Sequence, residues 1–439
     1  ALSGSSEKFN YILNTNFAKT DGLSEAASGN ANEDFESDAF KALNTFAKIG
    51  YQASERLTMN LTAAFDKDTY DYDGGAYVDS QINNGENKQY RYGFSSDYKY
   101  KKGSFKINIS LNKVDRMFDS YNGWTDAIDN FEYVGKTTFI DAFNKYEISR
   151  NLQLITGLNY VAQDNQTNSP YGNIDSELAN FSNVDPYLTF LFNSDSGFNL
   201  STGLRLNEHS EYGSHWVYHL NPSYNFSSTF KALGSVSTAY ITPSPYQLFS
   251  QYGNSELEPE SSNNIEAGFE FSKPNSLQLS GLFFYREEKD AILLPDFVKY
   301  QNSTEKLIAR GFESKAKIMF SQHINISLTH TYTNKSSDLD YIPKNKFAAT
   351  LNVRPIDKTR LSIQFSQLSK RSYFDQWGSG ETISIDGYGL LDLFVSHRLI
   401  KNKLDVFLRC SNVFNEEYVE TLGYSTKGRN YKLGIVFSL

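Results

Sequence analysis

Acidic residues recur at alternate positions in one early part of the chain and could bind a metal ion. Asp34 and Glu36 come first, and Asp71 and Asp73 follow in an acidic and aromatic run that contains two consecutive glycines. Carboxylate groups with this spacing can supply several of the oxygen ligands that Ca²⁺ requires. The spacing differs from that of an EF-hand loop, and Asp and Gly are also ordinary turn formers. The pattern therefore leaves open both a calcium site and a solvated loop.

Aromatic side chains at expected loop positions form a second group of candidate functional residues. Such rings could pack against a large organic ligand, although Tyr and Trp near strand ends also form the interfacial girdles of membrane proteins. The ligand-binding surface that we predict includes Tyr72, Tyr77, Tyr121, Trp124, Tyr373 and Trp377.

The motifs that would indicate an enzyme are missing from the sequence. It contains no GxSxG, GxGxxG, Walker or HExxH motif. His215 and His219 would lie ~13 Å apart on a strand, which is too far to chelate one metal ion. The formal net charge of −9 also argues against nucleic acid as a partner. We therefore predict a protein that is not an enzyme and does not bind nucleic acid.

The elements that must position these residues read as strands with two different faces. Phe105, Ile107, Ile109 and Leu111 alternate with polar residues, and the same period of two continues into the last strand, which begins at Tyr431. Aromatic residues make up 15% of a chain that is only 39% hydrophobic. There is no run of about 18 apolar residues that could form a transmembrane helix. Alternating strands with many aromatic residues are typical of an outer-membrane barrel, with one face in lipid and one on a wet lumen.

Short and long connections between these strands also alternate along the chain. The pattern predicts short turns at one end of the molecule and long loops at the other, except for a short connection at Glu208–Ser214. We predict an all-β fold in which residues 1–439 form one transmembrane antiparallel β-barrel of about 20 strands. A lumen of that width cannot be filled by the side chains of the wall alone.

Several motifs in the second half of the chain resemble those of TonB-dependent receptors. The C-terminal signature is carried by 412–418, Gly423-Tyr424 and Gly428-Arg429, and further family elements lie at 241–268 and 310–313. Thr242 and Ser255 stand where the family usually has Arg and Pro, and Leu439 replaces a terminal aromatic residue. These departures leave the resemblance intact.

The resemblance implies a multi-pass barrel in the lipid of the Gram-negative outer membrane, with a nutrient bound in extracellular loops and import driven by TonB. Members of the family also carry an N-terminal plug inside a barrel of about 22 strands. Residues 8–20 look like the third strand, so we expect the plug and the first two strands to be absent from this chain. A surface lipoprotein is a possible further partner.

Within the family, 198–215 and 424–429 are most similar to cobalamin receptors, which bind calcium between acidic residues of their early loops. That similarity implies cobalamin as the nutrient and Ca²⁺ at Asp34, Glu36, Asp71 and Asp73. The alternatives are a ferric siderophore, haem or another nutrient. A function of another class, either a passive porin-like channel or a structural partner in an envelope complex, also stays open.

Overall fold

The computed structural model describes residues 1–29, 35–295, 298–336, 341–375 and 380–438. Its dominant element is one antiparallel sheet of 21 strands, in which each strand pairs with its neighbour in the chain. The all-β fold predicted from the sequence is confirmed, and the number of strands is close to the predicted one. In the described part of the chain, no helix is long and apolar enough to cross a membrane.

The strands of the large sheet follow one another in chain order. The first ten are β1 (Leu2–Ser5), β2 (Phe9–Thr20), β3 (Phe40–Gln52), β4 (Leu57–Asp71), β5 (Asn84–Tyr100), β6 (Gly103–Asn122), β7 (Ala127–Ser149), β8 (Leu152–Asn168), β9 (Asn180–Asn193) and β10 (Phe198–His209). The others are β11 (Gly213–Asn225), β12 (Phe230–Ile241), β13 (Glu260–Lys273), β14 (Leu277–Lys289), β17 (Leu307–Ser321), β18 (Ile324–Lys335), β19 (Asn345–Ile356), β20 (Thr359–Leu368), β23 (Tyr388–Ile400), β24 (Leu404–Ser411) and β25 (Asn430–Phe437).

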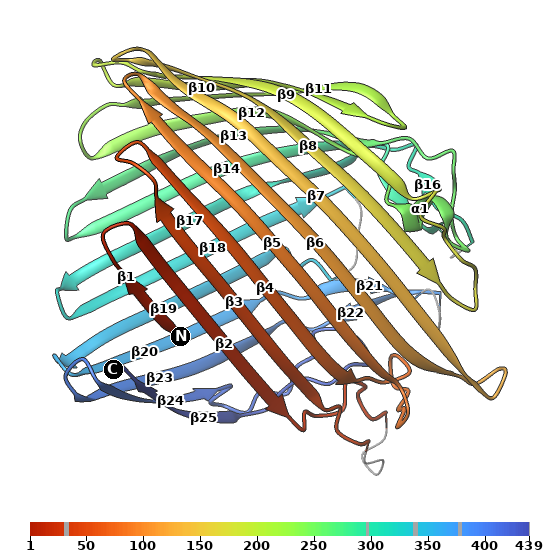
Figure 1. Ribbon diagram of the computed structural model, residues 1–439. Helices are drawn as coiled ribbons and strands as arrows, with labels where there is room; N and C mark the ends of the chain where they lie inside the picture. The colour runs from red at the N-terminus through yellow and green to blue at the C-terminus, as the bar shows by residue number, and fades with distance from the viewer. Residues whose placement is uncertain (30–34, 296–297, 337–340, 376–379, 439) are drawn as a thin grey trace.

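The sheet curves round on itself. In Figure 1, β2 to β8 cross in front and β10 to β20 cross behind at a different slope. Among the described residues, β1 pairs only with β2, and β25 pairs only with β24. Because β1 covers only Asn10 to Leu13 of its partner, most of that side of β2 is a free edge. The sheet is therefore barrel-like with two free edges.

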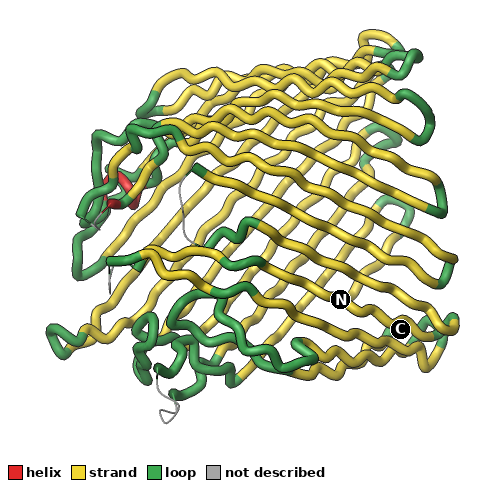
Figure 2. The backbone as a smooth tube through the Cα atoms, turned by 180° about the vertical axis from the view of Figure 1, so that it is seen from behind, coloured by secondary structure: helices red, strands yellow, loops and turns green. Residues whose placement is uncertain are grey.

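The two ends of the sheet differ in the connections they carry. Short turns lie at one end, which we call the turn end, and longer connections gather at the opposite loop end (Figure 2). The short connection predicted at Glu208–Ser214 is present as the tight turn between β10 and β11. Three loops contain elements of their own, namely α1 (Pro245–Phe249), the pair β15 (Ile292–Leu293) and β16 (Gln301–Asn302), and the pair β21 (Arg371–Phe374) and β22 (Thr382–Ile385).

The two faces of the sheet have opposite chemistry. Large apolar side chains are exposed on one face, among them Phe17, Leu61, Leu111 and Phe283, whose exposed fractions run from 47% to 67%. Apolar area of this extent on successive strands needs an apolar environment, so we assign this face to lipid. The other face is the lumen side.

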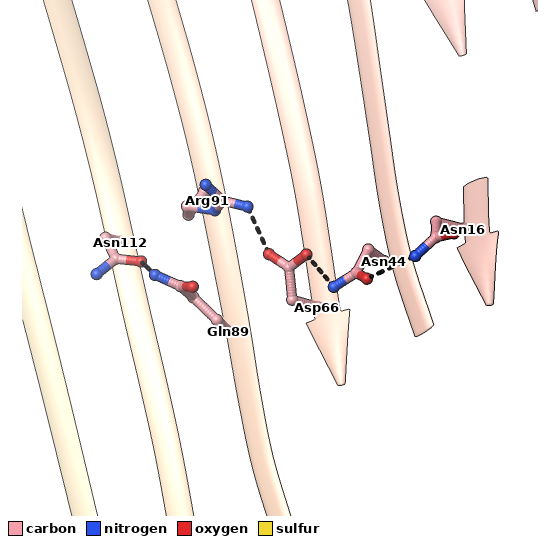
Figure 3. A network of polar contacts seen from close by, with 6 residues as sticks. All are labelled: Asn16, Asn44, Asp66, Gln89, Arg91 and Asn112. Carbon is pink, nitrogen blue, oxygen red and sulfur yellow. Dashed lines mark hydrogen bonds and ion pairs between the residues drawn. The ribbon is translucent and has the colours of Figure 1, made fainter. Parts of the chain in front are cut away.

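Polar side chains bond to one another across the lumen side of β2 to β6 (Figure 3). Asn16 donates to Asn44, which donates to Asp66, and Arg91 forms an ion pair with the same carboxylate at 2.5 Å. Gln89 donates to Asn112 one strand further on. These bonds satisfy several polar groups of the wall from within the sheet.

A small apolar core lies among the loops at the loop end and is separate from the apolar side chains of the lipid face. Leu248 of α1, Leu257 and Phe181 are buried together, and Leu257 is only 2% exposed. Ser244 starts α1 with a capping box, in which its side chain accepts from Gln247 N and Gln247 bonds back to Ser244 N. This core fixes the loops between β12 and β17 against the end of β9.

Candidate functional site

Three carboxylates come together at the loop end. Glu36 lies in the loop after β2, and Asp73 and Asp79 lie in the loop after β4. One ligand oxygen from each residue lies within 4.8 Å of the others. Such a group offers oxygen ligands from two separate loops to a single hard cation.

Asp73 occupies the centre of this group because both loops hold its side chain in place. The residue is 4% exposed, and its Oδ2 accepts bonds from Ala26 N at 2.6 Å and Ser24 Oγ at 3.0 Å. Its Oδ1 accepts a bond from Ser80 N at 2.9 Å. These donors fix the direction of the Asp73 carboxylate.

The neighbouring carboxylates are less well satisfied. Glu36 Oε2, Asp38 Oδ1 and Asp79 Oδ1 are buried and receive no hydrogen bond from the described residues. A side-chain hydrogen bond with Asp79, together with burial, raises the pKa of Glu36 to about 7. Burial raises the pKa of Asp38 to about 6, and the nearby Asp73 charge acts in the same direction. A bound divalent cation would oppose both shifts, because a nearby positive charge favours the ionised carboxylate.

The metal ligands predicted from the sequence are only partly those that meet in space. Glu36 and Asp73 belong to the group, and Asp34 lies outside the described residues. Asp71 ends β4, where it is exposed and pairs in register with Asn84, and it is not part of the group. Asp79 is the third member of the group. It lies in the acidic run but was not among the ligands predicted from the sequence.

Two of the predicted ligand-binding aromatic residues line a cavity of about 360 Å³ beside the carboxylates. Tyr121 and Trp124 lie on its wall, and Asp79 lines both this cavity and the acidic group. Trp124 is 99% exposed, so its ring is available to a ligand. Sequence reasoning missed Phe131 and Tyr171, which line the same cavity from β7 and the loop after β8.

The other predicted aromatic residues lie elsewhere. Tyr72 is partly buried against Phe118 and donates to the Asp119 carbonyl at 2.8 Å. Tyr77 is 48% exposed, and Tyr373 of β21 packs against Tyr341 with ring centroids 5.0 Å apart. Trp377 lies outside the described residues.

The last loop of the chain joins the two loops that carry the carboxylates. The Gly423 carbonyl accepts bonds from Ala27 N at 2.8 Å and Tyr77 N at 3.0 Å. Ser425 N donates to the Glu25 carbonyl, and Ser425 Oγ donates to the Ala26 carbonyl. We call residues 24–29, 35–38, 72–80 and 423–425 the loop junction.

The strongly buried arginine of the loops serves the fold rather than a ligand. Arg371 is 5% exposed and donates to the carbonyl groups of Val419 and Glu420. Its guanidinium also lies over the Tyr388 ring, 5.5 Å from the centroid. The structure thus directs Arg371 to the backbone of the last loop.

Comparison with known proteins relates most of the chain to one receptor family. The family profile described as "TonB dependent receptor-like, beta-barrel" matches residues 14–413. A curated relative, the vitamin B12 transporter BtuB of Photobacterium profundum, is 21% identical over 410 residues, which cover 90% of this chain and 64% of the relative. The chain thus spans somewhat less than two thirds of that protein's length.

Solved structures share the fold at lower sequence identity. The siderophore receptor PirA of Acinetobacter baumannii superposes with a TM-score of 0.81 at 18% identity, over 99% of this chain and 76% of its own. The copper transporter OprC gives a TM-score of 0.82 at 14% identity, over 100% of this chain and 77% of its own. The family match covers most of the 439 residues, so the chain belongs to the TonB-dependent receptors, and its residues 14–413 match their β-barrel.

Proposed function

We propose that this chain forms the barrel of an outer-membrane receptor that captures a scarce, bulky nutrient at its loop end. In this proposal the loop end is extracellular, the turn end is periplasmic, and TonB supplies the energy for import. The family match carries the proposal. A paired acidic and aromatic site at the loop end, where a ligand would arrive, supports it further.

Cobalamin is the nutrient that we favour. The curated relative is named a vitamin B12 transporter, and the similarity extends over 90% of this chain. Trp124 and Tyr121 offer flat apolar area to a large ring system beside the cavity. A group of carboxylates at the entrance also disfavours a negatively charged metal chelate, because like charges repel at short range.

Calcium is the cation that we propose for the loop junction. Glu36, Asp73 and Asp79 would be its ligands, and Asp38 lies close enough for the charge of Asp73 to raise the pKa of Asp38. Ca²⁺ accepts six to eight oxygen ligands in flexible geometry, which suits a site built from loops. By neutralising these carboxylates, the ion would draw the loops together and complete the floor beneath the aromatic cavity.

A ferric siderophore receptor is the second candidate. The solved structures that share the fold include PirA and the ferric enterobactin receptor PfeA of Pseudomonas aeruginosa, the latter with a TM-score of 0.81 at 16% identity. At these identities the likeness concerns the fold alone. Haem remains a further alternative, and a surface lipoprotein a further possible partner.

Calorimetric titration with cyanocobalamin tests the proposal. The protein is the complete product of the gene that encodes this chain, in detergent, first with Ca²⁺ and then with EGTA. We expect saturable binding that EGTA weakens. Absence of binding in both conditions would eliminate cobalamin and move siderophores forward. Open-channel conductance in a planar bilayer without binding of any nutrient would instead favour a passive channel.

A further inference from the structure

Every strand from β2 to β7 has a lysine on its outward face near the loop end. These lysines form three directly opposed pairs, which we call the lysine row: Lys19 and Lys41, Lys67 and Lys88, and Lys113 and Lys136. Because side chains alternate along a strand, they share the lipid face with residues two positions away, such as Phe17 and Leu111. Their chain neighbours Asp66 and Asn112 instead take part in the lumen-side bonds of Figure 3.

The three lysine pairs lie at one depth in the membrane. Lys41 opposes Thr69, two residues beyond Lys67, so the row moves two residues toward the turn end between the first and second pairs. The same step recurs between the second and third pairs. Two residues along a strand across two strand widths correspond to a slope of ~35°. Strands of transmembrane barrels tilt by about this angle, so residues at equal depth step from strand to strand in this way.

The border of the lipid face at the turn end has aromatic side chains instead of lysines. On four strands an outward-facing ring lies ten residues from the lysine of the same strand, namely Phe9, Tyr51, Tyr98 and Tyr146. Ten residues of a strand tilted by ~40° span ~25 Å of depth, which is the height of the apolar band of a transmembrane barrel. Within β2 to β7, all of whose residues the structure describes, no Asp, Glu, Lys or Arg faces outward between these two borders. The lysine row therefore lies at the level of the lipid headgroups, in the leaflet at the loop end.

The middle pair shows that an oxyanion fits between two opposed lysines of the row. Like charges that are directly opposed on neighbouring strands repel each other. The Glu86 carboxylate relieves this repulsion, because it forms ion pairs with Lys67, at 2.6 Å, and with Lys88.

The third pair keeps its side chains accessible. Lys113 forms an ion pair with Asp115 at 2.8 Å, and Lys136 forms one with Asp164 at 3.1 Å. The two lysine side chains are nevertheless 46% and 59% exposed. Ion pairs with this exposure are weak, and each ammonium group has three donors, so both lysines can contact a further anion.

We propose that the lysine row binds the phosphate groups of anionic lipid headgroups in the leaflet at the loop end. A lysine stem packs along apolar surface while its ammonium group reaches the headgroups, and phosphate offers that group strong acceptor oxygens. Successive pairs lie ~12 Å apart along the row, so a headgroup with two phosphate groups can contact two pairs, which a single phosphate cannot. The inference depends on the lipid face and the strand register, and not on which nutrient the loop end binds.

Titration with diphosphoryl and monophosphoryl lipid A, followed by native mass spectrometry, tests the row. The two lipids differ by one phosphate group, and the protein is again the complete gene product in detergent. We expect the diphosphoryl lipid to bind about threefold or more tightly than the monophosphoryl lipid. Its affinity should fall about tenfold or more in Lys19→Gln/Lys41→Gln/Lys113→Gln/Lys136→Gln, because each lysine near an anionic lipid surface contributes about a factor of five. This variant leaves Glu86 with both of its partners.

The matched control is Lys101→Gln/Lys102→Gln/Lys401→Gln/Lys403→Gln, which removes the same charge from exposed turns at the turn end. Circular dichroism and heat-modifiable gel migration establish that each variant is folded. Arginine at the four substituted positions of the row should keep the affinity within about threefold of the wild type. Equal loss in the turn control would show a non-specific charge effect and overturn the proposal. Equal affinity of the wild type for the two lipids would overturn it too.

Discussion

At the scale of single residues, the chemistry of the loop junction follows from where β4 ends. Alternate spacing in the sequence favoured Asp71 and Asp73 as a pair of ligands, which holds only while the chain remains a strand. The strand ends at Asp71, and the bond from Ser80 N to Asp73 folds the following loop back. Asp79 thereby reaches the site and Asp71 does not. That acidic residues supply this group could be predicted from the sequence, but this loop fold could not.

Substitution should distinguish the proposed cation ligands Asp73 and Asp79 from the neighbouring Asp71, which we expect not to bind the ion. We expect Asp73→Asn and Asp79→Asn each to lower Ca²⁺ affinity about tenfold or more, because each removes a charged oxygen ligand. Asp71→Asn carries the same charge change two residues away and should stay within about twofold of the wild type. Calcium titration monitored by calorimetry gives the comparison. Equal effects at residues 71 and 79 would contradict the proposed ligand set.

The pKa values of the junction predict its dependence on pH. The pKa of Glu36 is raised to about 7 and that of Asp38 to about 6, from ordinary values of 4.5 and 3.8. Protonation therefore stabilises the cation-free junction at low pH, and this stabilisation is lost as pH rises through 6 to 7. Because Ca²⁺ competes with these protons, its affinity should rise from pH 5.5 and level off above about pH 7.

Glu36→Gln provides the control for this dependence. The variant lacks the titrating group, so the step in Ca²⁺ affinity near pH 7 should disappear, while the contribution of Asp38 near pH 6 remains. A pH profile that is unchanged in this variant would assign the titration to another group.

At the scale of elements, the alternating pattern and the turn-forming residues predicted the strands and the short turns. They did not predict the contacts between loops. The strands and the short turns could be predicted because a period of two and local turn formers report them directly. The helix α1 spans only five residues, too few for a helical period to show. The contacts of Gly423 with Ala27 and Tyr77 join segments that are remote in sequence, so no local sequence pattern predicts them.

Gly423 provides a test of how the last loop is held. Its φ of +81° suits glycine, and a Cβ atom there would lie 2.4 Å from Ala76 Cβ. We expect Gly423→Ala to loosen the junction, to increase proteolytic cleavage within 412–429 and to weaken Ca²⁺ binding about threefold or more. Gly123→Ala is the matched control, since its Cβ atom would meet nothing nearer than 3.9 Å. Unchanged cleavage in Gly423→Ala would mean that the junction tolerates the displacement.

At the scale of the whole molecule, the division into a lipid face and a lumen side decides what each position tolerates. Ile109 and Ser110 are neighbours on β6 that point to opposite faces, and Ile109 lies between Ile107 and Leu111 on the apolar side. We expect Ile109→Arg to destabilise the protein by about 2–4 kcal/mol in lipid, because an exposed cation there must leave water. Ser110→Arg adds the same charge to the lumen side and should cost far less.

Unfolding by urea in phospholipid vesicles, followed by tryptophan fluorescence, measures this difference. Similar midpoints for the two arginine variants would show that the assignment of faces on β6 is wrong. A large loss for Ile109→Arg alone would support the same assignment for the other strands, since the register carries each face from strand to strand.

The loop junction also has a consequence in time. The bond from Ser425 Oγ to the Ala26 carbonyl joins residues 399 positions apart, so it closes nearly the entire chain into one loop. Contacts of such sequence separation form late, because the intervening strands must first be ordered. Ala26 N also holds Asp73, the central carboxylate. The proposed cation site would therefore be complete only after the last hairpin has formed, and calcium binding would report the final step of assembly.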